Sequence, residues 1–560
     1  MSVLIVTGGL VSAAETSLSG ALRKSVLQWR ASEAAWLDLK VKVVMAEPIA
    51  EAAVERLLGG APPEAELLMR GRDTLDLPEL AEVALATALD KEGLPYEAAT
   101  VAELFADAPR RAALLARAEA VYLSTTLLRD LGELETVLSL VRRPGIKVVV
   151  GGSLGSVLAE DPPPGVDVVA VGYGELLVPA LAAWARSGYR ALTPPDGGLL
   201  TRRAGAWVLR SGLPAGTSLD GLDTPDWAAA ARRRGRAGWK VVQYESVRGC
   251  PYRCAFCNYP FLFDDTRFRY KSARRIADDW TRYAQTCGTE VVSCLDSLFT
   301  VPPKRNRELC DILVARGTPV KWLCYARADD LADEETVAAM KAAGCVQVQI
   351  GLESGDPVVL ANMNKRVTPE ANLAALENCR KHGLTTVTTL IVGFPGETAA
   401  TLERTFEHLR HGRPDFHFLA TFSTRAAGVP VLEPESRARF GLRAASNPRT
   451  TAPYWDHDTM SCAQAGVHAR ALNRRLALAG TSLNAAVYYG GVLSYRPEMR
   501  APLLAFQKRA AERGVLRRAL FDPLNAFVDR RLAADVEAWL SGEPHPRSVS
   551  RPAAPEPLHA

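Results

Sequence analysis

The chain has 560 residues, too many for a single hydrophobic core, so three or more domains are expected. Its apolar content of 48% and charged content of 23% are those of an ordinary globular protein, and a net charge of +4 gives no basic surface of the kind that nucleic acids require. No apolar run is long enough to cross a bilayer, and the first residues do not resemble a cleavable signal. We therefore expect neither a nucleic-acid partner nor a membrane partner.

All ten cysteines lie between Cys250 and Cys462. A disulfide framework would not cluster in this way in a large chain, whereas reduced thiols and one metal site would. The cysteine pattern therefore predicts a cytoplasmic protein.

Residues 1–63 are rich in alanine and are predicted to form a mostly helical amino-terminal extension, with a short strand near Lys42–Met45. Over residues 64–195, short apolar runs alternate with amphipathic stretches, which predicts a doubly wound α/β domain with a parallel sheet. Such domains bind ligands beyond the carboxyl ends of their strands. The predicted strands are Glu66–Arg70, Tyr96–Thr100, Ala120–Ser124, Lys147–Val150 and Asp167–Val171.

Residues 196–239 are predicted to be a linker with a hairpin around Leu199–Leu209. Residues 240–428 again alternate strand and helix, and six parallel strands over this length predict a partial (β/α)6 barrel. These strands are Val241–Ser246, Val291–Leu295, Lys321–Tyr325, Gln347–Ile350, Thr386–Val392 and Asp415–Thr421. A mostly helical domain is expected over residues 429–545, followed by a disordered tail at 546–560.

Cys250, Cys254 and Cys257 share one short stretch, Arg-Gly-Cys-Pro-Tyr-Arg-Cys-Ala-Phe-Cys. Three thiolates on a tight loop can hold three irons of a [4Fe–4S] cluster and leave the fourth iron for another ligand. Structural zinc normally takes four protein ligands, and no histidine lies nearby to complete such a set. The alternative is three unrelated buried cysteines, which fits poorly with the glycine, proline, tyrosine and arginine between them.

This spacing, with an aromatic residue before the third cysteine, resembles the radical S-adenosylmethionine (SAM) superfamily. The resemblance implies that the open iron chelates SAM and that Phe256 contacts the adenine through its backbone. Glu353, after the fourth barrel strand, would accept hydrogen bonds from the SAM ribose or ammonium, and the alternative is an ordinary ion pair. Gly393, in a Gly-Phe-Pro-Gly-Glu-Thr run after the fifth strand, would let the backbone approach the adenine, although such a run alone is only a turn.

The second barrel strand departs from that superfamily. Where the family usually carries a Gly-Gly-Glu-like motif that binds the SAM ammonium, this chain has Ser-Cys-Leu-Asp, with Asp296 in the corresponding position. Cobalamin-dependent branches commonly show an acidic variant there. We therefore expect Asp296 to bind SAM, and the departure leaves open whether SAM chelates the cluster in the usual way.

The predicted amino-terminal strands end in glycine and hydroxyl residues. These ends resemble the cobalamin-binding domain that precedes the barrel in B12-dependent radical SAM methylases, and the absence of an Asp-x-His-x-x-Gly motif implies cobalamin without a lower axial histidine. The alternatives are a nucleotide-binding domain, although no Gly-x-Gly-x-x-Gly opens the first helix, and a purely structural sheet. The residues that would approach cobalamin are Ser124, Thr125, Gly151, Gly152, Gly172, Gly174 and Glu175.

Arg70 and Arg72 follow the first predicted strand. A cation at that strand end would face the crevice and approach the lower corrin face, where it would disfavour an axial ligand and raise the electrophilicity of a bound methyl group. Arg70 is therefore a predicted catalytic residue. The alternative is a solvated arginine that pairs with Asp73.

Over residues 65–545 the chain resembles the tryptophan 2-C-methyltransferase branch of thiopeptide biosynthesis. The resemblance implies a C-methyltransferase with a [4Fe–4S] cluster, cobalamin in its methylcobalamin form, and SAM, and it implies L-tryptophan as the small-molecule substrate. Indole C2 is nucleophilic once the N1 proton is removed, so no 5′-deoxyadenosyl radical is required, whereas an unactivated sp3 carbon would need one. A flavodoxin or ferredoxin is a candidate electron donor.

The helical region after the barrel offers several aromatic side chains to close the barrel mouth. Their faces could hold indole, and the Tyr488 hydroxyl could meet its N–H, so Tyr488 is the second predicted catalytic residue. The alternative is that these aromatics only pack the helical domain onto the barrel. The side chains are Tyr454, Trp455, His457, Tyr488 and Tyr489.

Two other functions are weighed against the methyltransferase. Methylthiotransferases that act on tRNA share the Gly-Phe-Pro-Gly-Glu-Thr run, but that family carries further cysteines before its barrel and a terminal RNA-binding module, whereas this chain has no cysteine before Cys250. A non-catalytic cobalamin or redox sensor would not need a second, SAM-type barrel.

Overall fold

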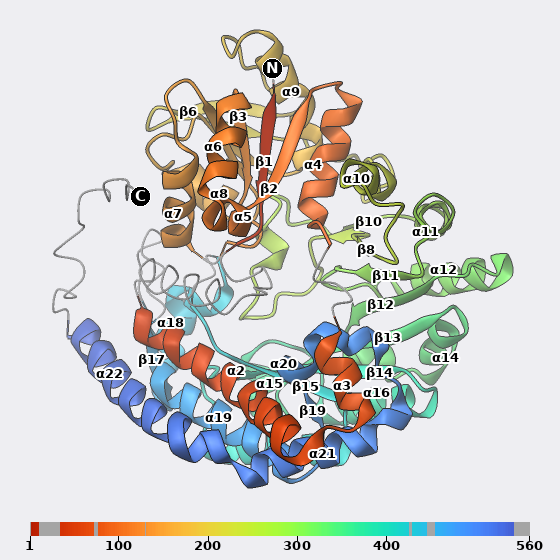
Figure 1. Ribbon diagram of the computed structural model, residues 1–560, viewed down its shortest axis with the longest axis vertical. Coiled ribbons are helices and arrows are strands. Elements are labelled where there is room, and N and C mark those ends of the chain that lie inside the picture. The colour runs from red at the N-terminus through yellow and green to blue at the C-terminus, as the bar shows by residue number, and fades with distance from the viewer. Residues whose placement is uncertain are drawn as a thin grey trace.

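The computed structural model describes residues 2–9, 34–71, 77–128, 130–424, 428–444 and 454–541. Two large parallel sheets organise these residues, and Figure 1 shows the amino-terminal sheet above the second one, around which helices are wrapped. None of the helices in these ranges is long and apolar enough to cross a membrane.

The amino-terminal sheet has the strand order β2-β1-β3-β4-β5-β7-β6. Its first five strands are parallel and their side chains alternate between two apolar cores, so the predicted doubly wound class is confirmed. The strands are β1 (Val3–Thr7), β2 (Tyr96–Thr100), β3 (Ala120–Ser124), β4 (Lys147–Gly151), β5 (Val168–Val171), β6 (Leu199–Arg203) and β7 (Ala206–Arg210). The helices are α4 (Leu80–Lys91), α5 (Val101–Ala106), α6 (Ala108–Arg117), α7 (Leu131–Val141), α8 (Gly155–Glu160) and α9 (Gly174–Arg186).

The second sheet is parallel throughout, with the order β19-β15-β14-β13-β12-β11-β8. Its six long βα units form the predicted partial barrel, and a short seventh strand joins at one edge. The strands are β8 (Val241–Tyr244), β11 (Val291–Cys294), β12 (Lys321–Ala326), β13 (Cys345–Glu353), β14 (Thr385–Val392), β15 (Phe416–Thr421) and β19 (Leu483–Asn484). The helices are α11 (Ala273–Cys287), α12 (Pro303–Arg316), α14 (Glu334–Ala342), α16 (Pro369–Lys381) and α17 (Ala399–Gly412).

The first strand of the amino-terminal sheet differs from the prediction. The central strand is β1, whose five residues are fully buried, whereas the predicted strand Glu66–Arg70 lies in helix α3 (Pro63–Arg70). A proline at the first turn and two early glutamates stabilise α3 as a helix. The predicted strand at Lys42–Met45 is likewise wrong, because these residues lie in α2 (Ala35–Glu55).

Residues 34–71 also belong to a different part of the molecule from the one predicted. Helices α2 and α3 pack against the carboxyl-terminal helices α19 (Cys462–Leu478), α21 (Arg500–Arg513) and α22 (Asp522–Leu540). Figure 1 shows α2 beside α22 and α21, although these helices are more than 400 residues away from α2 along the sequence. The amino-terminal sheet therefore takes β1 from the chain start, resumes at α4, and includes the hairpin β6–β7 that was assigned to the linker.

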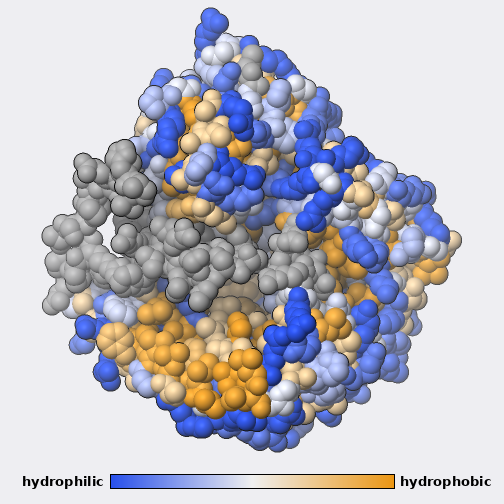
Figure 2. All heavy atoms as spheres, in the orientation of Figure 1, coloured by the Kyte–Doolittle hydropathy of each residue, from blue (hydrophilic) through white to orange (hydrophobic). Residues whose placement is uncertain are grey.

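Helix α2 buries its charged side chains and exposes apolar ones. Lys40 is 1% exposed and lies 2.7 Å from Asp529, and Glu47 pairs with Arg470 at 2.6 Å. The outward side of α2 and the turn after it carries Met45, Ile49, Leu57 and Leu58, and Figure 2 shows an apolar patch over this part of the molecule. Helix α2 thus packs through buried apolar residues such as Leu37 and Val44, and ion pairs compensate the charges that are buried with them.

His417 of β15 is a buried histidine that the fold keeps in its neutral form. Its Nδ1 lies 2.7 Å from Ser482 Oγ and its Nε2 lies 3.1 Å from Asn473 Oδ1, and burial lowers its pKa to about 4. Between pH 6.5 and pH 4 the unfolded chain binds a proton that the folded chain does not. Lowering the pH through this range therefore lowers the free energy of unfolding by about 3 kcal/mol for this group. Denaturant unfolding at pH 7 and pH 4 should therefore show the stability difference between wild type and His417→Gln shrinking by that amount. A constant difference would contradict the prediction.

Candidate functional site

The cysteine loop follows β9 (Val247–Arg248), just beyond the carboxyl end of β8. Cys250, Cys254 and Cys257 are half-buried, whereas the other seven cysteines of the chain are buried. Gly249 has φ +74°, and a Cβ there would lie 2.3 Å from the Arg267 carbonyl oxygen, so the turn into the loop requires glycine. The chemistry of the donors and their access to solvent fit a metal cluster rather than a packed core.

Among the residues that the structure describes, no three His, Cys, Asp or Glu side chains are grouped so that they could hold one metal ion together. The three cysteines share one loop, and cysteine thiolates are the ligands that iron–sulfur clusters take. Burial raises the pKa of all three thiols, that of Cys257 to about 11, so bound iron would have to stabilise the thiolates.

Backbone contacts fix the cysteine loop against two distant segments. The Ala255 amide donates to the Met363 carbonyl at 2.8 Å, and the Asn364 side chain donates to the Arg253 carbonyl at 2.7 Å. The Val431 amide donates to the Ala255 carbonyl at 2.9 Å. The segment after β13 and the start of the carboxyl-terminal region therefore both set the shape of the loop.

Two cations that the sequence reasoning did not select stand next to Cys254. Arg327, after β12, donates to the Lys365 carbonyl at 2.9 Å, and its guanidinium lies 3.8 Å from the centre of the Tyr252 ring. Its positive charge works against the rise that burial causes in the pKa of Cys254. Lys365 follows β13 and also favours a charged Cys254. The only signal that the sequence offered is their place in segments that follow strands of the barrel, Arg327 directly after β12 and Lys365 after the helix α15 (Pro357–Asn362) that follows β13.

Phe256 and Glu353 both lie beside Lys365 at this loop, and their predicted contacts with SAM stay predictions. Glu353 is 8% exposed, has φ +63°, and pairs with Lys365 at 2.9 Å. Lys365 Nζ is also 5.8 Å from the centre of the Phe256 ring, which packs edge-on against Phe394. The ion pair considered as the alternative for Glu353 is thus formed, and a left-handed glutamate is the kind of backbone strain that clusters at functional sites.

Asp296 does not reach an open site. It is completely buried, and its carboxylate accepts hydrogen bonds from the Ser246 amide (2.6 Å), the Ser246 hydroxyl (2.6 Å) and the Val247 amide (2.8 Å). Burial raises its pKa to about 6, against the opposing effects of Ser246 and Arg305. The predicted contact with SAM is replaced by a structural one, because Asp296 holds the turn that leads into the cysteine loop.

Gly393 is also enclosed by protein. Its φ is +91°, its amide donates to Glu397, and its carbonyl lies 3.2 Å from His457 Nε2. A Cβ would meet Ala465 at 2.6 Å and Trp455 at 2.8 Å, so this glycine serves close packing of the carboxyl-terminal domain rather than the predicted approach to adenine.

Four of the five aromatic side chains predicted at the barrel mouth are buried, three of them in packing contacts. Trp455 donates to the Phe422 carbonyl at 3.0 Å, Tyr454 donates to Asp535 at 3.0 Å, and His457 stacks on Trp455. Tyr489, in contrast, is 65% exposed. The packing alternative therefore holds for Tyr454, Trp455 and His457.

Tyr488 lies in an apolar cluster between strands β14 and β15 and residues of α2 and α3. It is fully buried beside Phe416 and Val387, at the amino-terminal half of β14 and β15. Among the described residues its hydroxyl has no hydrogen-bond partner. An unpaired buried hydroxyl costs about 1–3 kcal/mol, so this atom is suited to meet a polar group of a ligand.

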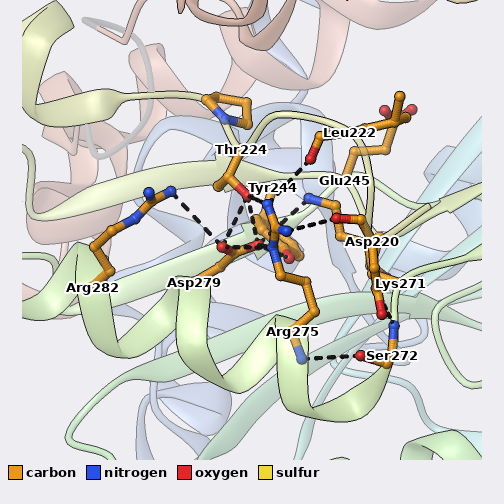
Figure 3. Close-up of polar contacts among 12 residues, drawn as sticks. Asp220, Leu222, Thr224, Tyr244, Glu245, Lys271, Ser272, Arg275, Asp279 and Arg282 are labelled. Atoms are coloured by element: carbon orange, nitrogen blue, oxygen red, sulfur yellow. Dashed lines mark hydrogen bonds and ion pairs between the residues drawn. The ribbon is translucent and has the colours of Figure 1, made fainter. Parts of the chain in front are cut away.

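Behind β8, a polar cluster holds the cysteine-bearing edge of the barrel (Figure 3). Asp279 of α11 accepts hydrogen bonds from Thr224 (2.9 Å), Tyr244 (2.7 Å) and Arg275 (3.1 Å). Lys271 lies 4.4 Å from the Tyr244 ring centre. The linker is therefore tied to α11 and β8, which fixes the strand from which the cysteine loop departs.

In the amino-terminal sheet, the crevice is expected at the carboxyl ends of the neighbouring strands β1 and β3. The strand order reverses between these two strands, since β2 lies beyond β1 on one side and β4 lies beyond β3 on the other. Ser124 and Thr125 end β3, and Thr125 donates to the Gly151 carbonyl through its amide (2.7 Å) and its hydroxyl (2.8 Å). Gly152 has φ +100°, and a Cβ there would lie 3.0 Å from the Thr125 amide nitrogen. The structure thus brings these four predicted residues to one edge.

The end of β1 adds residues that the prediction missed. Gly8 has φ +84°, and its amide donates to Glu79, whose pKa burial raises to about 7. The missed signal is the Thr-Gly-Gly that follows the apolar run Val3–Val6, the same strand-end pattern that marked β4.

The end of β5 gives a different result. Gly172 has φ +99° and faces Ser211, and Gly174 begins α9. Glu175 is committed to Arg248 of β9, with its Oε1 2.5 Å from Arg248 Nη2. The prediction that Glu175 contacts cobalamin is corrected, because its carboxylate is consumed by this ion pair.

Arg70 lies at the end of α3 instead of a strand end. Its guanidinium pairs with Glu66 at 2.9 Å, and its side chain is 71% exposed. The predicted position at the sheet crevice is therefore wrong, and Arg72 and Asp73 lie outside the described residues.

Residues 244–409, from β8 to α17, match the family model of the radical SAM superfamily, so the chain contains a radical SAM domain. An uncharacterized methyltransferase of Pyrococcus horikoshii is 31% identical over 160 residues, which are 29% of this chain and 34% of the relative. The anaerobic magnesium-protoporphyrin IX monomethyl ester cyclase of Cereibacter sphaeroides is 28% identical over 266 residues (45% and 42%). The ribosomal protein uS12 methylthiotransferase RimO of Gloeobacter violaceus is 31% identical over 179 residues (30% and 40%). The chain thus spans less than half the length of each of these relatives.

The fold is similar to that of the radical SAM methyltransferase TsrM from Kitasatospora setae. A structure of TsrM with tryptophan and a SAM analogue matches with a TM-score of 0.54 and 19% identity, covering 67% of this chain and 77% of TsrM. A second TsrM structure, with cobalamin and a [4Fe–4S] cluster bound, matches with a TM-score of 0.52 and 20% identity. At this identity the similarity is one of fold.

Proposed function

We propose that the chain is a cobalamin- and SAM-dependent C-methyltransferase that methylates C2 of L-tryptophan. One observation carries the proposal: the glycine-ended carboxyl edge of the amino-terminal sheet and a half-buried three-cysteine loop are joined by the ion pair of Glu175 and Arg248, whose side chains are 13% and 10% exposed. A sensor would need only the crevice. The fold shared with TsrM, whose structures contain tryptophan, cobalamin and the cluster, supports the same assignment.

The residues at the cysteine loop fit a cluster with SAM. Cys250, Cys254 and Cys257 would hold three irons, and Arg327 and Lys365 would offset the charge of the thiolates. Phe256 and Glu353 lie beside the same loop, where a bound SAM would find an aromatic face and a carboxylate. Bound cluster and cobalamin would supply electron transfer and methyl-group transfer.

The sheet crevice fits cobalamin without a protein imidazole. All eight histidines of the chain follow residue 381, so the amino-terminal domain contains none. Gly8 and Gly152, at the ends of two strands, have positive φ angles that other residues rarely adopt, and they place no side chain over the strand ends. The crevice can therefore accept a flat, bulky ring, and bound cob(II)alamin should lack nitrogen splitting in its EPR spectrum.

The acceptor would lie in the barrel, above Tyr488. Tyr325 and Phe418 are half-buried. Their strand neighbours Cys324 and Leu419 belong to the main core cluster, so Tyr325 and Phe418 face the opposite side of the sheet, toward the barrel interior. Their aromatic faces suit a flat indole, and the unpartnered Tyr488 hydroxyl suits its N–H.

The decisive test is one anaerobic incubation of the reconstituted full chain with SAM, cobalamin, a reductant and L-tryptophan. We expect methyltryptophan without stoichiometric 5′-deoxyadenosine, measured by mass spectrometry. Tyr488→Phe should raise the KM for tryptophan about tenfold, which corresponds to the loss of one hydrogen bond, while Tyr489→Phe serves as the exposed control.

The same incubation separates the other outcomes. Stoichiometric 5′-deoxyadenosine with a different methylated acceptor would move the chain to radical methylation of an unactivated carbon. Transfer of a methylthio group would assign it to the chemistry of RimO and overturn the proposal.

A further inference from the structure

Arg248 lies at the boundary between the amino-terminal sheet and the radical SAM domain, two residues before Cys250. Its Nη2 and Nη1 lie 2.5 Å and 3.1 Å from the two carboxylate oxygens of Glu175, in the first turn of α9. Its Nε donates to Glu245, after β8, at 2.9 Å. One guanidinium thus joins the crevice side of the site to the cluster side.

The surroundings of this pair shield most of it from water. The side chains of Arg248 and Glu175 are 10% and 13% exposed, and the rings of Tyr173 and Phe263 lie 5.1 Å from the guanidinium carbon. Tyr173 is held in turn, since its hydroxyl donates to Asp265 at 3.0 Å. A planar guanidinium is suited to this role because it can bind a carboxylate through two bonds while it stacks on aromatic faces.

Other contacts cross the same boundary, but they differ in burial. Arg210 of β7 pairs with Asp264, and these side chains are 26% and 43% exposed. An exposed pair contributes at most about 1 kcal/mol, whereas removal of one partner from a buried pair costs about 3–5 kcal/mol. Of the three polar contacts described at this boundary, the pair of Arg248 and Glu175 and the hydrogen bond from Tyr173 to Asp265 are therefore the two that are largely shielded from water.

We infer that Arg248 and Glu175 are positioning residues that hold the cysteine loop in a fixed register with the carboxyl edge of the amino-terminal sheet. The inference rests on the proposed function for its catalytic consequence: the register sets the separation between SAM at the cluster and cobalamin in the crevice. Methyl transfer between two bound groups is sensitive to such placement, and an error of about 1 Å can cost about 100-fold in rate.

The first arm of the test needs no cofactor. In the full-length chain, Glu175→Gln removes the charge while keeping the shape, and Arg248→Lys keeps the charge but loses the two-bond geometry. Hydrogen exchange of residues 172–178 and 246–258 should accelerate about tenfold or more in both variants. Asp264→Asn, the exposed control at the same boundary, should stay within about twofold of wild type. Unchanged exchange in Glu175→Gln would overturn the inference whatever the enzyme does.

The second arm uses the reconstituted enzyme. Glu175→Gln should keep about four irons per chain and an unchanged KM for SAM, while kcat falls about 100-fold. Loss of iron in this variant would overturn the inference, because the pair would then be needed to form the loop rather than to place it. If wild type itself transfers no methyl group, the proposed function fails while the exchange arm still decides the positioning role.

Discussion

Replacement of Cys250, Cys254 and Cys257 by alanine is expected to abolish both iron binding and SAM-dependent turnover. These three thiols are the half-buried ones, and the other seven are enclosed in the protein, so no other cysteine can take their place. Anaerobically reconstituted wild type should bind about four irons per chain and show sulfur-to-iron charge-transfer absorption. The triple variant should bind none and lose that absorption.

The controls for this prediction are Cys310→Ala and Cys379→Ala, which alter buried cysteines of α12 and α16. Both should keep wild-type iron, because neither thiol reaches the loop. Full iron in the triple variant would remove the basis of the cluster assignment.

Replacement of Asp296 by alanine is expected to destabilise the chain by about 3–5 kcal/mol. The substitution leaves the Ser246 and Val247 amides and the Ser246 hydroxyl without their acceptor, and it leaves the buried Arg305 without a nearby negative charge. Ser246 and Val247 lie where the chain turns from β8 into β9, so the cysteine loop should lose its anchor as well. Denaturant unfolding and iron content after reconstitution measure the two effects.

Asp296→Asn is the matched comparison for that variant. An amide oxygen can still accept a hydrogen bond but carries no charge, so we expect a loss of about 1–3 kcal/mol and partial retention of iron. If Asp296→Ala folds with wild-type stability but no longer binds SAM, then the structural role assigned here is wrong and the ligand role predicted from sequence is right.

The sequence by itself determined the features that are local in the chain. The cysteine spacing specifies its loop because all three ligands lie within eight residues. Six strands of the barrel and four of the amino-terminal sheet were predicted near their observed positions, since buried parallel strands are short apolar runs between amphipathic helices. The glycines at the ends of these strands could also be identified from the sequence, because a left-handed backbone conformation favours glycine at that one position.

Only the tertiary structure decided which partners these residues have. Arg248 and Glu175 are 73 residues apart and Asp296 lies 50 residues from Ser246, so no periodic pattern links them. A carboxylate after a strand has the same sequence signature whether it meets a ligand, as predicted for Asp296 and Glu175, or a buried amide or guanidinium, as observed.

The placement of residues 34–71 shows the same limit for whole elements. Helix α2 buries charged residues together with apolar ones and exposes Met45 and Ile49, so no clean apolar face in its sequence indicates where it packs. Pairs such as Glu47 with Arg470, 423 residues apart, compensate the buried charges. Long-range apolar contacts and ion pairs, which depend on the completed fold, thus decided the position of α2, whereas local periodicity determined the strands of both sheets.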